Sequence, residues 1–188
     1  MAHDKEPQSS RSTKLVIRNI GLLLSGDLKR PVLDGDTIVS VDGKIFGIGY
    51  EKDLDTEGAG TLVDANGTAV APGLIDSHVH PVAGDWTPRQ NQLGWIDSAL
   101  HGGVTTMISA GEVHTPGRPR DIVGLKAMAI NAQRTFSGFR PGGVKIHAGA
   151  PCIEPEMEEV DFKELASAGV RLLGRGRARW CQGWTISP

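Results

Sequence analysis

The chain has 188 residues, of which 20 are Lys or Arg and 22 are Asp or Glu, giving a formal net charge of −2. This balance shows no basic excess of the kind that indicates nucleic acid as a partner. No apolar run approaches the roughly 18–20 residues that cross a bilayer, and the polar first residues lack the apolar centre of a signal peptide. We therefore expect a cytoplasmic protein that binds neither nucleic acid nor membrane, with Cys152 and Cys181 as free thiols.

Short strands separated by turns are predicted over residues 14–72, after a disordered leader at 1–13. The dipeptide Asp42-Gly43 favours a hairpin turn, and Asn66-Gly67 marks a further turn. Strand composition occurs at 15–17, 20–24, 37–41, 44–48, 61–64 and 68–70. Together these features predict a small antiparallel β layer.

Apolar residues change their period after Pro72. Helical spacing indicates helices over 92–101, from Asp121 to Phe136, and from Asp161 to Gly169. Asp121 is the expected N-cap of the second helix, and Asp161 with Glu164 resembles a capping box for the third.

Segments of strand composition alternate with these helices, the later ones at 104–109, 144–147 and 170–173. The resulting β-α-β-α-β-α-β order predicts parallel strands joined by crossover helices. Four such strands form either an open sheet or half of an eight-stranded barrel.

Two histidines end the first strand of this series, within PGLIDSHVH at 72–80. Side chains at positions i and i+2 of a strand share a face, so His78 and His80 project the same way. A neutral imidazole is a good ligand for zinc and other borderline divalent metals. The pair is thus a candidate for two ligands of one metal ion, the alternative being solvated strand-end histidines. Asp76 either orients an imidazole or satisfies a local turn.

Three further stretches carry a resemblance to a known family: SALHGGVTTMISAG at 98–111, PGRP at 116–119 and RPGGVKIHAGA at 140–150. With the histidine pair and the preceding β region, they resemble the metal-dependent amidohydrolase superfamily, and within it the enamidase-like enzymes. The resemblance covers about residues 14–174. It implies an α/β fold, with the N-terminal half of a (β/α)₈ TIM-like barrel at 73–174 preceded by a small antiparallel β-sandwich segment at 14–72.

The resemblance also implies a chemistry, namely metal-dependent hydrolysis of C–N bonds in cyclic amides. His78 and His80 would bind one or two divalent ions, with zinc expected and iron as the alternative. Lys145 and His147, at the end of the third strand, would contact a small cyclic amide substrate. Full-length members are expected to form homo-oligomers. No catalytic residue is assigned, because the later histidines and the aspartate of the family have no counterpart here.

Residues 175–188 depart from the family pattern and have no periodicity. Arg175 stands where enamidase-like members carry a glutamate ligand, so we interpret this tail as a frameshifted end and the chain as a truncated, inactive form. Two alternatives stay open. One is a dihydroorotase- or hydantoinase-type cyclic amidase, for which a carboxylated lysine is expected and Lys145 comes one strand early. The other is a non-catalytic binding or assembly protein with an amidohydrolase-like shell.

Overall fold

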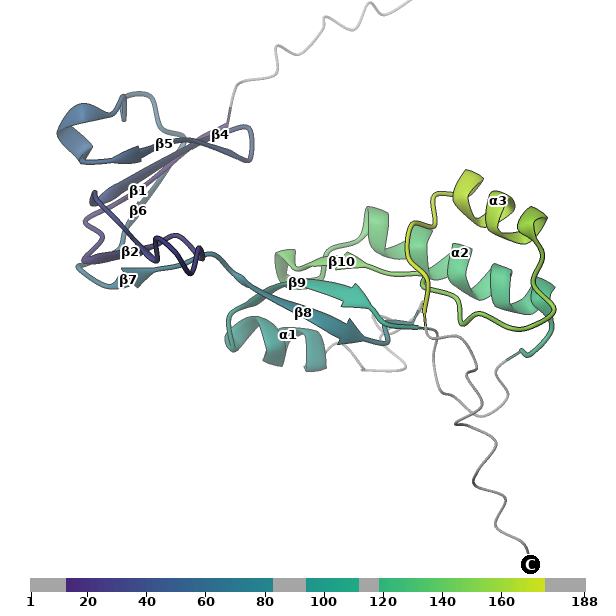
Figure 1. The fold of residues 1–188 in the computed structure, drawn as a ribbon. Coiled ribbons are helices and arrows are strands. Elements are labelled where there is room, and N and C mark those ends of the chain that lie inside the picture. Colours follow the sequence, from purple (N-terminus) through teal and green to yellow (C-terminus); the bar gives the residue numbers. More distant parts are fainter. Residues whose placement is uncertain (1–12, 83–93, 112–118, 175–188) are drawn as a thin grey trace, which may run out of the picture. The chain divides into compact units, whose positions relative to one another are not determined.

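The chain forms two compact units that divide between Pro72 and Gly73 (Figure 1). The computed structural model describes residues 13–82, 94–111 and 119–174. The interpretations of the leader and of the tail at 175–188 concern residues outside these ranges, apart from residue 13. Within the described ranges, no helix combines the length and the apolar character needed to span a membrane.

The first unit consists of two small sheets. Its elements are β1 (Lys14–Arg18), β2 (Leu22–Leu24), β3 (Val32–Leu33), β4 (Thr37–Val41), β5 (Lys44–Gly49), the 3₁₀ turn η1 (Glu51–Asp53), β6 (Thr61–Asp64) and β7 (Ala69–Val70). Four strands pair in the order β5-β4-β1-β6 and three in the order β3-β2-β7. β4 and β5 form a hairpin whose turn residues, Asp42 and Gly43, have φ of 50° and 77°. The predicted hairpin turn is confirmed.

The predicted purely antiparallel layer is wrong, because both sheets are mixed. β1 runs parallel to β6, and β2 runs parallel to β7. The chain bends at Asn19, between β1 and β2, and again at Asn66, between β6 and β7, with φ of 55° and 51°. The segment β1-β2 therefore lies beside the segment β6-β7 in both sheets. Parallel neighbours need a long connection, which β3, β4 and β5 supply.

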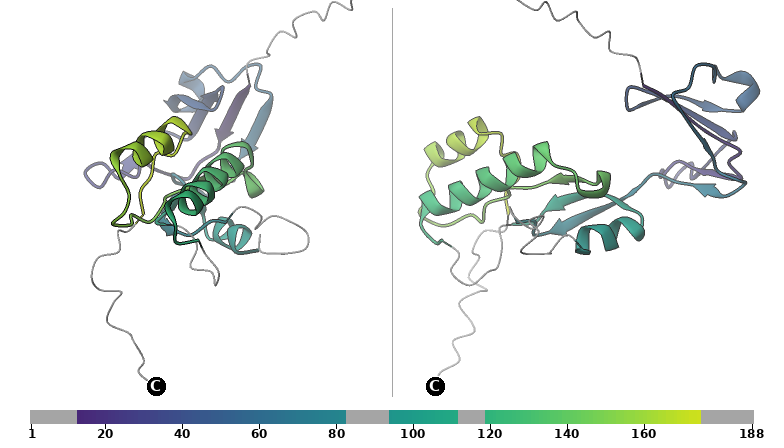
Figure 2. Two further views of the ribbon diagram at one scale, coloured as in Figure 1. Left: turned by 90° about the vertical axis from the view of Figure 1, so that its right-hand side faces the viewer. Right: turned by 180° about the vertical axis from the view of Figure 1, so that it is seen from behind.

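The second unit is a parallel three-stranded sheet with helices. Its elements are β8 (Leu74–Val79), α1 (Gly94–His101), β9 (Val104–Ser109), α2 (Ile122–Gly138), the 3₁₀ turn η2 (Pro141–Gly143), β10 (Lys145–His147) and α3 (Glu159–Ser167). β9 lies between β8 and β10 and is parallel to both. α2 runs alongside β10 (Figure 2). The predicted α/β order is confirmed as far as the third helix.

One face of this sheet is buried against α1 and α2. Val79, Met107 and Ile146 come from the three strands and pack with Ile96 of α1 and Phe136 of α2. Full burial of an apolar side chain of this size contributes about 1.5–3 kcal/mol. Because side chains alternate along a strand, the residues next to these in sequence lie on the opposite, open face.

The predicted fourth strand at 170–173 is wrong, since these residues form no strand. β10 is only three residues long, and Gly149, with φ of 84°, turns the chain after it. The edge of β10 therefore offers few backbone groups for hydrogen bonds to a further strand. The amide of Gly174 instead donates to the carbonyl oxygen of Pro151 at 2.8 Å.

The capping box of α3 lies three residues earlier than predicted. Glu158 is the N-cap, and the Asp161 side chain accepts a hydrogen bond from its amide at 2.9 Å, while the Glu158 side chain bonds the amide three residues on. Glu164, the residue expected to form the capping box with Asp161, pairs with Lys126 instead. The predicted N-cap of α2, Asp121, is confirmed.

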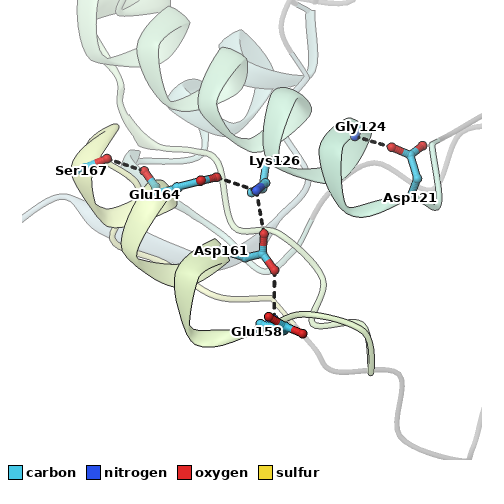
Figure 3. A network of polar contacts seen from close by, with 7 residues as sticks. All are labelled: Asp121, Gly124, Lys126, Glu158, Asp161, Glu164 and Ser167. Atoms are coloured by element: carbon cyan, nitrogen blue, oxygen red, sulfur yellow. Dashed lines mark hydrogen bonds and ion pairs between the residues drawn. The ribbon is translucent and has the colours of Figure 1, made fainter.

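Lys126 joins α2 to α3 (Figure 3). Its Nζ lies 2.6 Å from Asp161 Oδ1 and 2.5 Å from Glu164 Oε2. The side chains of Lys126 and Asp161 are only 16% and 11% exposed. The hydrogen bond from Lys126 is the main reason that the pKa of Asp161 lies below its usual value, and the same bonds raise the pKa of Lys126.

We expect Lys126→Met to lower the urea midpoint of unfolding at pH 7, because Asp161 would keep its charge with one partner fewer. A carboxylate whose pKa is lowered by folding stabilises the protein above its ordinary pKa, and this stabilisation is lost as the pH falls through the folded-state pKa. The difference between the variant and the parent should therefore shrink as the pH falls through the lowered pKa of Asp161. Circular dichroism would follow both transitions.

Lys163→Met is the matched control. Lys163 pairs with Glu159 on the surface of α3, where the two side chains are 73% and 83% exposed. Such pairs contribute less than about 0.5 kcal/mol. An equal decrease of the urea midpoint in the two variants would contradict the assigned role of Lys126. A difference between Lys126→Met and the parent that persists in acid would contradict it as well.

Candidate metal centre

β8 is bulged directly before the two candidate histidines. Its register with β9 shifts between Asp76 and Val79. Asp76 Oδ1 accepts a hydrogen bond from the amide of His78 at 2.9 Å. An aspartate that bonds the amide two residues on replaces a ladder bond, and bulges of this type redirect the side chains that follow. Of the two roles expected for Asp76, this bond corresponds to the local turn.

The two imidazoles meet at the end of β8. The ring centroids of His78 and His80 are 5.3 Å apart, and the ring planes are 81° from parallel. Val79, between them, is buried in the core, so the histidines lie toward the open face of the sheet. His78 is exposed and His80 is half-buried. The side chains therefore share a face, as their spacing predicts.

The distance between these rings fits two ligands of one metal ion. Zinc binds imidazole nitrogen at about 2.0–2.1 Å in tetrahedral geometry, which places two ring centroids roughly 5 Å apart. The observed 5.3 Å is close to that value. Catalytic zinc ordinarily takes three protein ligands, and the described ranges contain no group of three or more His, Cys, Asp or Glu that could hold an ion. The histidine pair is thus suited to be part of a metal centre.

His80 is held from the side of β9. Its Nδ1 lies 3.0 Å from the carbonyl oxygen of Gly111, which also accepts a hydrogen bond from Ser109 Oγ at 3.2 Å. Sequence reasoning missed Ser109 and Gly111, although both lie in a stretch that carried the family resemblance. Only the close approach of the β9 end to the β8 end reveals their contact with His80.

Lys145 and His147 lie on the same open face but on another strand. Both are exposed, while Ile146 between them is buried. His147 pairs with Ile108, and β9 separates β10 from β8. Neighbouring strands are about 4.8 Å apart, so the backbones at His147 and His78 are roughly 10 Å apart. The structure places these residues on one face without bringing them into one cluster, and their contact with substrate stays a prediction.

A pocket of about 280 Å³ runs along the outer edge of β10. Its lining includes Lys145 and His147 of β10, Arg140 before it, and Arg171 and Leu172 from the stretch predicted as a fourth strand. No carboxylate contributes to this lining. The pocket is therefore unsuited to a cation and lies apart from the histidine pair.

Several known enzymes are similar to this chain in sequence. No protein-family model matches the chain. The chain is 51% identical over 162 residues to enamidase from Eubacterium barkeri, a match that covers 86% of this chain and 42% of enamidase. It is 40% identical over 171 residues to imidazolonepropionase from Paenarthrobacter aurescens (strain TC1), covering 89% and 41% respectively. The chain thus spans about two fifths of the length of these relatives.

The solved structure of enamidase agrees with the sequence match. That enzyme is a member of the amidohydrolase superfamily. The chain superposes on it with a TM-score of 0.79 and 50% identity, covering 87% of this chain and 43% of enamidase.

We expect Asp76→Ala to loosen the bulge before the histidines, because alanine cannot accept the hydrogen bond from the His78 amide. That amide should exchange with solvent roughly fivefold faster, which corresponds to about 1 kcal/mol for the lost bond. Hydrogen exchange followed by NMR measures this rate. Asp76→Asn keeps an acceptor oxygen and should exchange like the parent. Equal acceleration in both variants would show that the side-chain bond does not hold the bulge.

Proposed function

Because this chain belongs to the amidohydrolase superfamily, a family of hydrolases, we propose that it is part of a metal-dependent enzyme that hydrolyses C–N bonds in cyclic amides. The observation that carries the proposal is the contact of His78 with His80 at a spacing that suits one ion. The 51% identity to enamidase supports an enamidase-type reaction.

The histidine pair would bind the metal, with zinc as the expected ion and iron as the alternative. A bound divalent ion supplies a water of lowered pKa and polarises the scissile carbonyl. Gly111 would orient the imidazole of His80, and Asp76 would hold the backbone at His78 through its bond to the amide. Lys145 and His147, both exposed on β10, would contact a small cyclic amide.

We propose that each unit is part of a larger shape, a small β-sandwich for 14–72 and the first half of a (β/α)₈ barrel for 73–174. Uncovered apolar surface supports this. The first unit has an apolar pocket of about 350 Å³, whose lining includes Leu15, Ile38 and Val70. In the second, Ile75 is 65% exposed. Apolar surface of this kind is ordinarily covered by further protein. The complete enzyme would be a cytoplasmic homo-oligomer.

The position of Lys145 disfavours the hydantoinase-type alternative. A lysine that bridges metals has to reach the ions held by the histidines. Lys145 instead belongs to β10, one strand before the position at which such a lysine is expected.

The activity test uses the longest reading frame that contains residues 14–174, including any frame that continues past codon 174. We expect the zinc-loaded product to hydrolyse cyclic enamides. His78→Ala should abolish the activity, because a single histidine retains the ion poorly. The 188-residue chain should be inactive. A longer, metal-loaded product without activity on any cyclic amide would contradict the proposed reaction.

We expect Arg175→Glu to raise the zinc affinity of the chain about tenfold or more, because the family resemblance implies a glutamate ligand at this position. Gly174 packs so closely that a Cβ on it would lie 2.7 Å from Gly111 Cα, and Gly111 contacts His80. Gly174 therefore packs against the residue that contacts His80. Competition with a chromophoric chelator measures the affinity.

Arg140→Glu is the control for this charge change. Arg140 precedes β10, at the opposite ends of the strands from His78 and His80. The Arg140→Glu substitution should leave the zinc affinity at the parent value. An equal gain in both variants would mean that net charge, rather than a new ligand, attracts the ion.

A further inference from the structure

We propose that Ser109 and Gly111 position His80 as a metal ligand by fixing its imidazole in the tautomer that carries the proton on Nδ1. The proposal rests on the metal role proposed above for the histidine pair. The central contact is that of His80 Nδ1 with the Gly111 carbonyl oxygen, 3.0 Å away. A carbonyl oxygen can only accept, so Nδ1 has to donate. In the neutral ring the lone pair then resides on Nε2, the nitrogen that would bind the ion.

Gly111 presents its carbonyl because its backbone adopts a conformation that other residues rarely reach. Its φ is 153°, in the region that favours glycine. Two hydrogen bonds with one hydroxyl hold this residue: Ser109 Oγ donates to the Gly111 carbonyl oxygen at 3.2 Å and accepts from the Gly111 amide at 3.4 Å. Ser109 is 5% exposed, so water competes little for these bonds.

The end of β9 around Gly111 is also fixed by neighbouring elements. The amide of Ala110 donates to the carbonyl oxygen of Val79 at 2.9 Å, which ties the end of β9 to the end of β8. Gly174 packs against Gly111 closely enough that a Cβ on Gly174 would lie 2.7 Å from Gly111 Cα. The acceptor for His80 is thus held on several sides, as the orientation of a metal ligand requires.

The test reads the tautomer directly. Long-range proton–nitrogen NMR of the metal-free chain, labelled at histidine and kept above about pH 8 so that the rings are neutral, distinguishes a proton on Nδ1 from one on Nε2. We expect His80 to carry its proton on Nδ1. Ser109→Ala should shift the ring toward a mixture of tautomers, and Ser109→Thr, which keeps the hydroxyl, should restore the parent spectrum. The missing signal in His80→Gln assigns the resonance.

Ser167→Ala is the matched control. Ser167 Oγ also donates to a backbone carbonyl oxygen, that of Glu164, at 2.7 Å, but it lies on α3 (Figure 3). This variant should leave the His80 tautomer unchanged. A parent ring protonated on Nε2, or a Ser109→Ala ring identical to the parent, would overturn the proposal.

Zinc affinity separates this proposal from the one on which it rests. In the Arg175→Glu background, Ser109→Ala should weaken zinc binding about tenfold, as loss of a residue that orients a ligand commonly does. An Nδ1 proton that depends on Ser109, combined with no zinc binding in any variant, would overturn the metal role and leave the orienting contact standing. Weakened zinc binding with an unchanged tautomer would overturn the orienting role alone.

Discussion

Burial of one face of the β8-β9-β10 sheet is the constraint on which the candidate site depends. Val79 and Ile146 enter the core beneath α1 and α2. Strand alternation then leaves His78, His80 and His147 toward the open face, whatever their own preferences. The core thus selects which side chains are available for chemistry, and packing that has no chemical role determines where an ion or a substrate could approach.

A common face does not by itself bring two side chains to one point, because alternate positions on a regular strand are nearly 7 Å apart. The bulge at Asp76 and the contact with Gly111 supply the remaining constraint. The first acts on the backbone before His78 and the second on the ring of His80. Each uses an acceptor supplied locally, and the two rings lie 5.3 Å apart.

The sequence allowed the face and the order of elements to be predicted, because both follow from local periodicity. The shared face of His78 and His80 follows from their spacing, and the helix after Asp121 from its apolar repeat. Which strands pair with one another was harder to predict from the sequence. Strand composition at 170–173 forms no strand because the edge of β10 is too short, a property of the partner rather than of the stretch itself. The parallel pairing of β1 with β6 joins residues more than forty apart, beyond any local pattern.

The open face links the proposed metal site to the exposed apolar surface. Ile75, 65% exposed, pairs with Thr106 opposite Lys145, and so lies on the face that carries the histidines. Protein that covers this face would bury Ile75 and at the same time bring side chains toward His78 and His80. An ion that binds only when this face is covered stabilises the covered form, and this stabilisation grows with the logarithm of the ion concentration. Covering the sheet and binding an ion at the proposed metal site would then be thermodynamically coupled, and each would favour the other.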